Sequence, residues 1–286
     1  MGKIGIIGGS GLYDIEGIKS IEKIRLKTPF GAPSDEFILG NLEGKEVVFL
    51  PRHGRGHKIL PSELNYRANI YGMKKLGVQR IISVSAVGSL KEEVKPQHFV
   101  LADQFIDRTN QARKTTFFGE GIVAHIGFAE PTCPALRKML FEIAKEFGLS
   151  AHPKGTYINM EGPAFSTRAE SHLYRSWGVD VIGMTNMAEA RLAREAEICY
   201  VTMAMVTDYD CWHAEEEAVS IDLILENMRK NVEQAKKIIK SAVSKIDQRR
   251  DCLCAGALKG AIVTAAKDIP AQTKKKLDII IGKYIK

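Results

Sequence analysis

Two carboxylates stand two residues apart in the segment Thr207-Asp-Tyr-Asp-Cys-Trp212, which follows an apolar run of strand length. Asp208 and Asp210 are therefore expected just beyond a buried strand, where they either point into a common cleft or carry solvated loop charge. If they point inward, they suit a base with an exocyclic amine, because a carboxylate accepts from N–H groups and a protonated carboxyl donates to a ring nitrogen. An amide at this place would suit a 6-oxo purine instead.

A second segment has the residue types of an anion site. Gly8-Gly-Ser-Gly11 follows the first apolar run; its glycines let backbone N–H groups approach an anion, and Ser10 adds a hydroxyl. A dinucleotide loop fits poorly, because G-x-G-x-x-G aligned on Gly9 and Gly11 places Asp14 where the third small residue belongs. By itself the segment is as often a plain tight turn, so it predicts a short phosphate loop only together with other evidence.

That evidence is Pro51-Arg-His-Gly-Arg-Gly-His57, which has two Arg and two His in a glycine-bent loop after another expected strand. Arg52 offers a fork for phosphate oxygens, and His53 can donate to the same anion. The alternative is a basic surface loop. Zinc is less suitable, because His53 and His57 have no obvious Cys or Glu partner. Since both glycine-containing segments end early strands, we expect a shared phosphate site.

The elements that position these residues follow from hydrophobic periodicity. Apolar runs predict strands at residues 3–7, 36–39, 47–50, 80–84, 156–160, 179–182 and 198–206. Helical patterns cover residues 61–76, 136–147, 167 onward, 188–196 and a long helix that Ser220 can cap. This alternation predicts a single α/β domain with a central mixed β-sheet flanked by helices on both faces. In such sheets ligands bind beyond the carboxyl ends of the strands.

Composition narrows the class of protein. The apolar share of 45% and charged share of 26% are ordinary for a soluble enzyme. The net charge of +7 is not arranged as a stripe of Lys and Arg among aromatics, which argues against nucleic acid as a partner. No stretch is long enough to span a membrane, and the first apolar run is too short for a signal peptide. We therefore expect a cytoplasmic protein.

Residues 247–286 change to small residues and Lys, so we expect a main domain over 1–246 and a C-terminal extension packed on it or on a neighbouring subunit.

The segments described so far, with others, occur in the order found in a known family. The chain closely resembles the 5′-methylthioadenosine phosphorylases, in the trimeric branch of the purine-nucleoside phosphorylase family. The resemblance covers residues 3 to about 246. It rests on Gly-Gly-Ser-Gly-Leu12, Thr-Pro-Phe-Gly31, Arg-His-Gly-Arg55, Asn-Tyr-Arg-Ala68, Gly-Ser-Leu90, Asp-Gln-Phe-Ile-Asp-Arg-Thr109, Glu-Gly-Pro163, Ser-Thr-Arg-Ala-Glu170, Met-Thr185 and Thr-Asp-Tyr-Asp-Cys-Trp212.

The resemblance assigns roles by position. It implies that phosphate is bound by Ser10, Arg52, His53, Ser85, Ala86 and Thr185. Many members have Thr at the first of these positions, and Ser10 keeps the hydroxyl. Phe165 would stack on the purine, Met184 would lie against the ribose, and Ser166, Asp208 and Asp210 would line the base site. His125 would come from a neighbouring subunit, near the 5′ end of the substrate. Ile221 and Ile224 would form the apolar wall for a methylthio group.

The implied reaction is phosphorolysis of 5′-methylthioadenosine to adenine and 5-methylthioribose 1-phosphate, a pentosyl transfer in purine and methionine salvage. Asp208 would protonate the leaving base near N7, which requires its pKa to be raised by burial or by Asp210. Phosphate is then a co-substrate, with no metal or organic cofactor, and the protein is a homotrimer or hexamer. A phosphorylase that also accepts adenosine or inosine, a hydrolytic nucleosidase and a non-catalytic nucleoside-binding module are the alternatives.

Five cysteines are an odd, low count, which argues against a secreted disulfide framework. Cys252-Leu-Cys254 is compatible with two free thiols or with the intracellular disulfides of hyperthermophiles. Relatives from hyperthermophiles have intrasubunit disulfides and a C-terminal Cys-x-Cys, which Cys252-Leu-Cys254 resembles. Cys252–Cys254 and Cys133–Cys199 are the candidate disulfides, each left open against free thiols, and Cys211 is expected to be unpaired.

Overall fold

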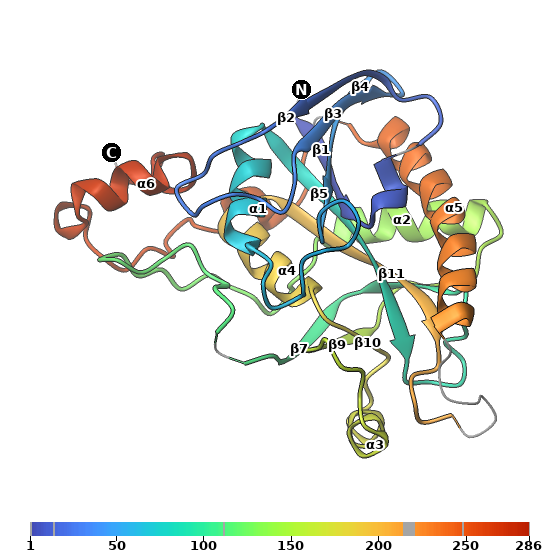
Figure 1. Cartoon of the computed structure of the whole chain (residues 1–286). Coiled ribbons are helices and arrows are strands. Elements are labelled where there is room, and N and C mark those ends of the chain that lie inside the picture. Colours follow the sequence, from blue (N-terminus) through green and yellow to red (C-terminus); the bar gives the residue numbers. More distant parts are fainter. Residues whose placement is uncertain (1, 14, 111, 214–220, 248, 286) are drawn as a thin grey trace.

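The computed structural model describes residues 2–13, 15–110, 112–213, 221–247 and 249–285 (Figure 1). Among these residues eleven strands form one mixed sheet. The strands are β1 (Lys3–Gly8), β2 (Lys19–Ile24), β3 (Phe37–Leu42), β4 (Lys45–Pro51), β5 (Val78–Ser89), β6 (Phe99–Ala102), β7 (Gln104–Arg108), β8 (Ala151–His152), β9 (Thr156–Met160), β10 (Val181–Gly183) and β11 (Cys199–Asp208). The helices are α1 (Tyr66–Lys75), α2 (Pro134–Glu146), α3 (Arg168–Ser176), α4 (Asn186–Glu195), α5 (Ile221–Lys245) and α6 (Ala271–Ile281).

The sheet divides at β5, its longest strand. One path runs β2-β3-β4-β1-β5-β10-β9-β7, and β11 pairs with β5 along a second edge and continues to β6 and β8. The pairing of β1 with β5 reaches only Ser83, whereas β11 stays paired with β5 as far as Gly88. Beyond Ser83, therefore, β5 and β11 run side by side to the edge where the sheet opens.

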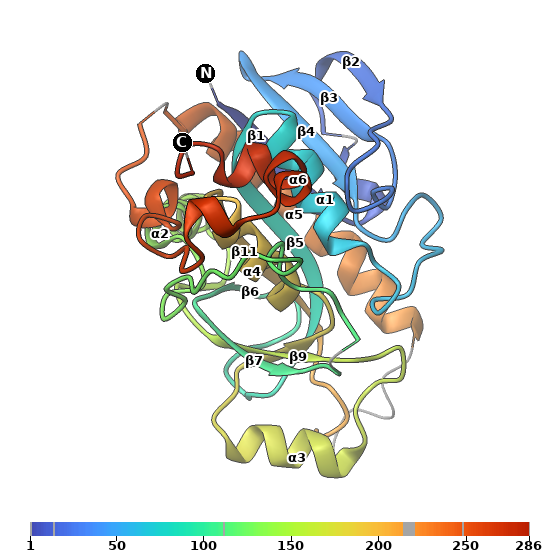
Figure 2. The same ribbon diagram turned by 90° about the vertical axis from the view of Figure 1, so that its left-hand side faces the viewer.

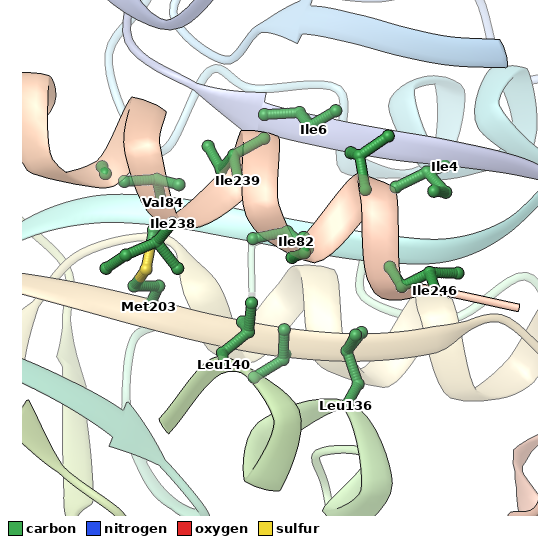
Figure 3. Packing of buried hydrophobic residues seen from close by; sticks show 14 of the residues in the cluster. Ile4, Ile6, Ile82, Val84, Leu136, Leu140, Met203, Ile238, Ile239 and Ile246 are labelled. Atoms are coloured by element: carbon green, nitrogen blue, oxygen red, sulfur yellow. The ribbon is translucent and has the colours of Figure 1, made fainter. Parts of the chain in front are cut away.

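Helices cover both faces of this sheet, as the alternating pattern predicted (Figures 1 and 2). Along β11, Val201 and Met203 pack with α2 and α5, while Tyr200 packs in the opposite cluster with α1 and α4. Figure 3 shows the first of these clusters, where Ile238 and Ile239 of α5 lie against the strand side chains. Because β11 is buried along its whole length, its end is held by core packing on both faces.

Local signals placed most elements within a few residues. The expected strands at 36–39 and 47–50 form a hairpin: β3 and β4 meet at Glu43 and Gly44, whose φ values of 51° and 75° fit a type I′ turn. The expected helix 61–76 was wrong at its start, because α1 begins at Tyr66. There the Asn65 side chain accepts from the backbone N–H of Ala68 and caps the helix. The expected cap of α5, Ser220, lies outside the described residues.

The extension 247–286 contains α6, which the sequence did not predict, and it contributes to the core. Leu277, Ile280 and Ile281 of α6 pack in the same cluster as Tyr71 of α1. Figure 2 shows α6 over this side of the molecule. Strands β2, β6, β7 and β8 were not predicted either. None of the helices in the described ranges is both long and apolar enough to cross a membrane.

Candidate active site

The two acidic residues singled out in the sequence lie where β11 ends. Asp208 is the last residue of β11 and is paired with Gly88 of β5. A Cβ atom on Gly88 would lie 3.0 Å from Oδ1 of Asp208, so glycine here leaves room for the close approach of the carboxylate. Ser85 and Ala86 precede Gly88 on the same strand, roughly 7–10 Å away at about 3.3 Å per residue. The two strands thus hold the carboxyl of Asp208 and the residues Ser85 and Ala86 at a separation similar to the length of a small molecule.

Asp208 is buried, with 8% of its surface exposed. Its carboxylate accepts from the Thr207 hydroxyl at 2.7 Å and from the backbone N–H of Asp210 at 2.8 Å. Burial raises the pKa of Asp208 above its usual value, and these two hydrogen bonds oppose that shift only in part. The carboxyl therefore keeps its proton to a higher pH than an exposed aspartate does.

Asp210 is equally buried and stands in a left-handed backbone conformation, with φ 55°. Burial raises its pKa, and the charge of Asp208 adds to the shift, while the hydroxyls of Ser171 and Ser166 act against it. Its Oδ2 atom has no hydrogen bond of normal geometry from any described residue. A buried carboxyl oxygen without a donor is costly, so it is a natural acceptor for an N–H group of a ligand.

The end of β11 is fixed by side chains that the sequence reasoning missed. Asn227 and Asn231 of α5 donate to the carbonyls of Thr207 and Val206, each at 2.8 Å. The indole of Trp212 donates to the carbonyl of Ser89 at 2.7 Å. The two asparagines, at spacing four, interrupt the apolar side of α5, and a buried amide pair on an apolar face is the signal that could have revealed them.

The remaining residues assigned to the base and sugar lie on nearby loops. Ser166 accepts from the Cys211 thiol through its carbonyl, at 3.2 Å, which brings it beside the Asp210 segment. Met184 is half-buried against Gly162, where a Cβ atom would lie 2.5 Å from the Met184 sulfur. Phe165 is 63% exposed, so its ring is available to stack on a planar ligand.

Arg52, which the sequence predicted as a bidentate phosphate ligand, instead makes most of its hydrogen bonds to protein groups. Its guanidinium is buried and bonded to protein: Nε and NH2 donate to Glu189 at 2.6 and 3.3 Å, NH1 to the Val84 carbonyl at 2.9 Å, and NH2 to Ser83 at 2.6 Å. A guanidinium has five N–H groups, and four of them are engaged here. The planar fork expected for phosphate is therefore directed toward Glu189.

Glu189 was not found from the sequence and is the centre of a buried polar network. Besides Arg52, the hydroxyls of Ser83 and Tyr200 donate to its carboxylate at 2.6 and 2.9 Å. The amide of Asn186 donates to Ser83 at 3.1 Å, and Thr185 donates to Asn186 at 3.2 Å. An acidic residue flanked by Ala188 and Ala190 in an apolar helix pattern was the available signal. The network links the expected phosphate residues Arg52 and Thr185 through α4.

His53 has a defined hydrogen bond on one nitrogen. Its Nδ1 lies 2.8 Å from the Ile59 carbonyl, so Nδ1 carries the proton and Nε2 is left for other partners. Burial, with the neighbouring Arg52 charge, lowers the pKa of His53 to about 4. The imidazole is thus neutral at physiological pH, and its unprotonated Nε2 is a hydrogen-bond acceptor.

Ser85 and Ala86 lie at the open edge of the sheet. The Ser85 hydroxyl is buried near Tyr157 and makes no hydrogen bond of normal geometry with a described residue. Ala86 is exposed although it lies between buried residues of a central strand. Thr185 caps α4 at its positive end. An unpaired hydroxyl and a helix N-terminus are both suited to an anion.

Three expected residues are placed only in part. Ser10 begins a short 3-10 helix after β1, and the backbone N–H of Arg52 donates to the carbonyl of Gly8 at 2.9 Å, which brings the two loops together. The side chains of Ser10, Ile221 and Ile224 lie outside the described part of the chain, although their backbones are placed.

His125 lies elsewhere in the fold. It is exposed, and its backbone N–H donates to the carbonyl of Ala261 at 2.9 Å, beside the C-terminal extension. Within the described residues no hydrogen bond joins it to Asp208 or to the Arg52 loop. Its position next to the extension leaves it available to a second molecule.

Comparison with known proteins gives concordant matches. Residues 3–244 match the family model of the phosphorylase superfamily. The S-methyl-5′-thioadenosine phosphorylase of Geobacter sulfurreducens is 62% identical over 282 residues, which are 99% of each chain. A methylthioadenosine phosphorylase from an Antarctic soil metagenomic library superposes with a TM-score of 0.93, at 49% identity over 97% of this chain and 98% of that one. A variant of the adenosine/methylthioadenosine phosphorylase of Schistosoma mansoni, in complex with methylthioadenosine, gives 0.84 at 37% identity over 91% and 96%.

Proposed function

The chain belongs to the phosphorylase superfamily and, within it, to the S-methyl-5′-thioadenosine phosphorylases, and we propose that it performs the reaction with the residues described above. It is a pentosyltransferase that cleaves 5′-methylthioadenosine with phosphate, giving adenine and 5-methylthioribose 1-phosphate. The observation that carries the assignment of the site is the buried carboxyl pair Asp208 and Asp210 at the end of β11, at the open edge of the sheet.

At the base end, Asp208 acts as the general acid. The N-glycosidic bond breaks through a ribosyl centre with oxocarbenium character, and adenine leaves poorly as an anion. A protonated Asp208 carboxyl donates to N7 as the bond lengthens, and burial keeps that proton in place. The donor-free Oδ2 of Asp210 accepts from the exocyclic amine. Ser166 completes the base site, and the exposed ring of Phe165 stacks on the purine.

At the other end, phosphate is both the nucleophile and the counter-charge for the ribosyl cation. Ser10, Ser85, the backbone of Ala86 and Thr185 donate to it. Arg52 contributes its buried positive charge and one remaining N–H group, with Glu189 fixing its position. His53 accepts from the P–OH group of monohydrogen phosphate through Nε2. Met184 lies against the ribose between the two ends. The reaction so described requires no metal and no organic cofactor.

The residues proposed to contact the 5′ substituent include two whose side chains lie outside the described part of the chain. Ile221 and Ile224 form the apolar wall for the methylthio group, and His125 is contributed by a neighbouring subunit. The enzyme is accordingly a homo-oligomer, a trimer or a hexamer, acting in the cytoplasm. The exposed position of His125 beside the C-terminal extension supports this arrangement.

A substrate panel tests the proposed reaction. Methylthioadenosine, adenosine, inosine and guanosine are incubated with the protein at saturating phosphate and without phosphate, and the products are identified by chromatography. We expect adenine and a sugar 1-phosphate from methylthioadenosine only when phosphate is present, with weaker use of adenosine. Because one methylene-sized difference in an apolar pocket is worth only ~10–200-fold, adenosine turnover within that range fits the proposal. Free methylthioribose formed without phosphate would identify a hydrolase, and binding without turnover would exclude an enzyme.

Replacing Ser85 with alanine is expected to raise KM for phosphate by roughly 10–100-fold while leaving KM for the nucleoside almost unchanged. The reason is that a hydrogen bond to an anion is worth about 1.5–3 kcal/mol, and the Ser85 hydroxyl makes no hydrogen bond of normal geometry with a described residue. Initial rates at varied phosphate measure the effect.

The control is Ser89→Ala on the same strand, because the Ser89 hydroxyl donates to the Lys91 carbonyl at 2.9 Å. It is expected to lower the free energy of unfolding by about 1 kcal/mol and to leave KM for phosphate unchanged. Equal phosphate KM values in the two variants would argue against Ser85 as a phosphate ligand.

A further inference from the structure

Four of the five cysteines meet at one place, at the opposite end of β11 from Asp208. The Sγ atoms of Cys133, Cys199, Cys252 and Cys254 all lie within 4.8 Å of one another. Cys199 and Asp208 are the first and last residues of β11, so the cluster lies roughly 30 Å from the candidate active site at about 3.3 Å per residue. The proposed phosphorolysis makes no use of these thiols.

The four thiols come from three separate parts of the chain. Cys133 is the N-cap of α2, and its backbone N–H donates to the carbonyl of Tyr200 in β11 at 2.7 Å. Cys199 points to the face of the sheet that α2 and α5 cover. Cys252 and Cys254 belong to the extension after α5, and Leu253 between them is 89% exposed. Because the intervening side chain points outward, both flanking thiols are directed inward to the same centre.

The cluster is buried beside two sources of positive charge. Cys133, Cys199 and Cys254 are buried, and Cys252 is half-buried. Cys133 lies at the positive end of α2, and Arg80 is paired in register with Cys199, so its positive charge lies on the same face of the sheet. Partial neutralisation of this kind is what a cluster of buried thiolates requires.

The separations fit tetrahedral coordination. Four sulfurs around a zinc ion at about 2.3 Å lie about 3.8 Å from one another. The upper limit of 4.8 Å in the cluster and the 3.4 Å between the sulfurs of Cys199 and Cys252 bracket that value. The disulfides suggested by the sequence, Cys133–Cys199 and Cys252–Cys254, are not formed, since all five cysteines are free. The 3.4 Å contact joins neither expected pair, and each thiol has the other three as neighbours.

We propose that Cys133, Cys199, Cys252 and Cys254 bind one Zn²⁺ ion as four thiolates, the thiols releasing their protons on binding. Zinc suits this donor set because it is redox-inert and accepts a closed set of four sulfur ligands. With all four positions filled by protein, the ion has no open site for substrate. Its role is to join the C-terminal extension to β11 and α2, so that the segment leading to α6 is fixed to the core.

The test measures zinc in the full-length protein. The protein is purified under reductant without chelator, incubated with zinc chloride, desalted, and analysed by inductively coupled plasma mass spectrometry. We expect about one zinc per chain. Cys252→Ser and Cys254→Ser are expected to lose most of it. Cys211→Ser is the matched control: Cys211 is the fifth cysteine and lies outside the cluster, so its variant is expected to keep the full zinc content.

Two further measurements keep the proposal testable if the serine variants fold poorly. Wild-type protein loaded with Co²⁺ in place of zinc is expected to show thiolate-to-cobalt charge-transfer absorption of the intensity of four sulfur ligands. Removing zinc from the wild type with a chelator is expected to lower Tm by roughly 5–10 °C, and zinc should restore it. Wild-type protein that holds no zinc after incubation with zinc chloride and desalting would overturn the proposal. So would zinc retained equally by Cys252→Ser, iron in place of zinc, or disulfides that persist under reductant.

Discussion

Asp208→Asn is expected to lower kcat for methylthioadenosine by ~10²–10⁴-fold, the usual contribution of a general acid. An asparagine amide cannot transfer a proton to the leaving adenine at the required pH, although it occupies the same volume. The variant should still fold, because an amide oxygen at this place can still accept from the Thr207 hydroxyl or from the backbone N–H of Asp210. Steady-state kinetics at saturating phosphate and nucleoside measure the loss.

The pH profile separates loss of the acid from loss of binding. A general acid works in its protonated form, so wild-type kcat should fall as pH rises through the raised pKa of Asp208. In Asp208→Asn this alkaline limb should disappear. Asp268→Asn, a substitution of an exposed aspartate, is the control and should keep both kcat and the limb. Full turnover by Asp208→Asn would exclude Asp208 as the acid, whereas a shift of preference toward inosine would support its role in recognising the base.

Glu189→Gln is expected to lower the free energy of unfolding by about 3–5 kcal/mol, because it leaves the buried Arg52 guanidinium without its counter-charge. The amide also replaces one acceptor oxygen by a donor, where Arg52, Ser83 and Tyr200 all donate. We expect KM for phosphate to rise more than KM for the nucleoside, since Arg52 and α4 shift together. Urea unfolding and initial-rate kinetics report the two effects.

Glu233→Gln is the matched control for that variant. Glu233 is exposed and pairs with Lys236 three residues along α5, and pairs of this kind contribute at most about 0.5 kcal/mol. A free energy of unfolding for Glu189→Gln within 1 kcal/mol of the wild-type value would mean that Arg52 does not depend on Glu189. Equal changes in both KM values would show that Glu189 acts on stability without positioning the phosphate residues.

Many strands, turns and helix ends could be predicted from the sequence because they depend on residues that are close together in the chain. The hairpin at Glu43 and Gly44 follows from turn chemistry, and α2 ends before Gly148, as its periodicity predicted. The errors lie where tertiary contacts decide. The predicted helix included residues 61–65, yet the cap at Asn65 sets the start of α1. Helix α6 is stabilised by burial of Leu277 and Ile281 against distant strands and helices, which composition does not reveal.

The position of the acidic pair along the chain was also predicted correctly from the sequence. An apolar run followed by Asp208 and Asp210 sufficed to place both carboxyls after a buried strand, and the motif order identified the family. Whether those carboxyls were exposed to water or buried was not decided by spacing. That depended on Gly88, which allows close approach, and on Asn227 and Asn231, which hold the strand end.

The sequence by itself determined which chemical groups are present and the order of the strands and loops that bear them. Tertiary structure alone decided what those groups face. Arg52 was interpreted as a free phosphate fork, but its guanidinium is bonded to Glu189, a residue 137 positions away in the chain. Cys133, Cys199 and the pair around Leu253 form one cluster although they come from three segments. The physical reason is that hydrogen bonds and thiol clusters act over a few ångströms in space, and periodicity along the chain carries no such distances.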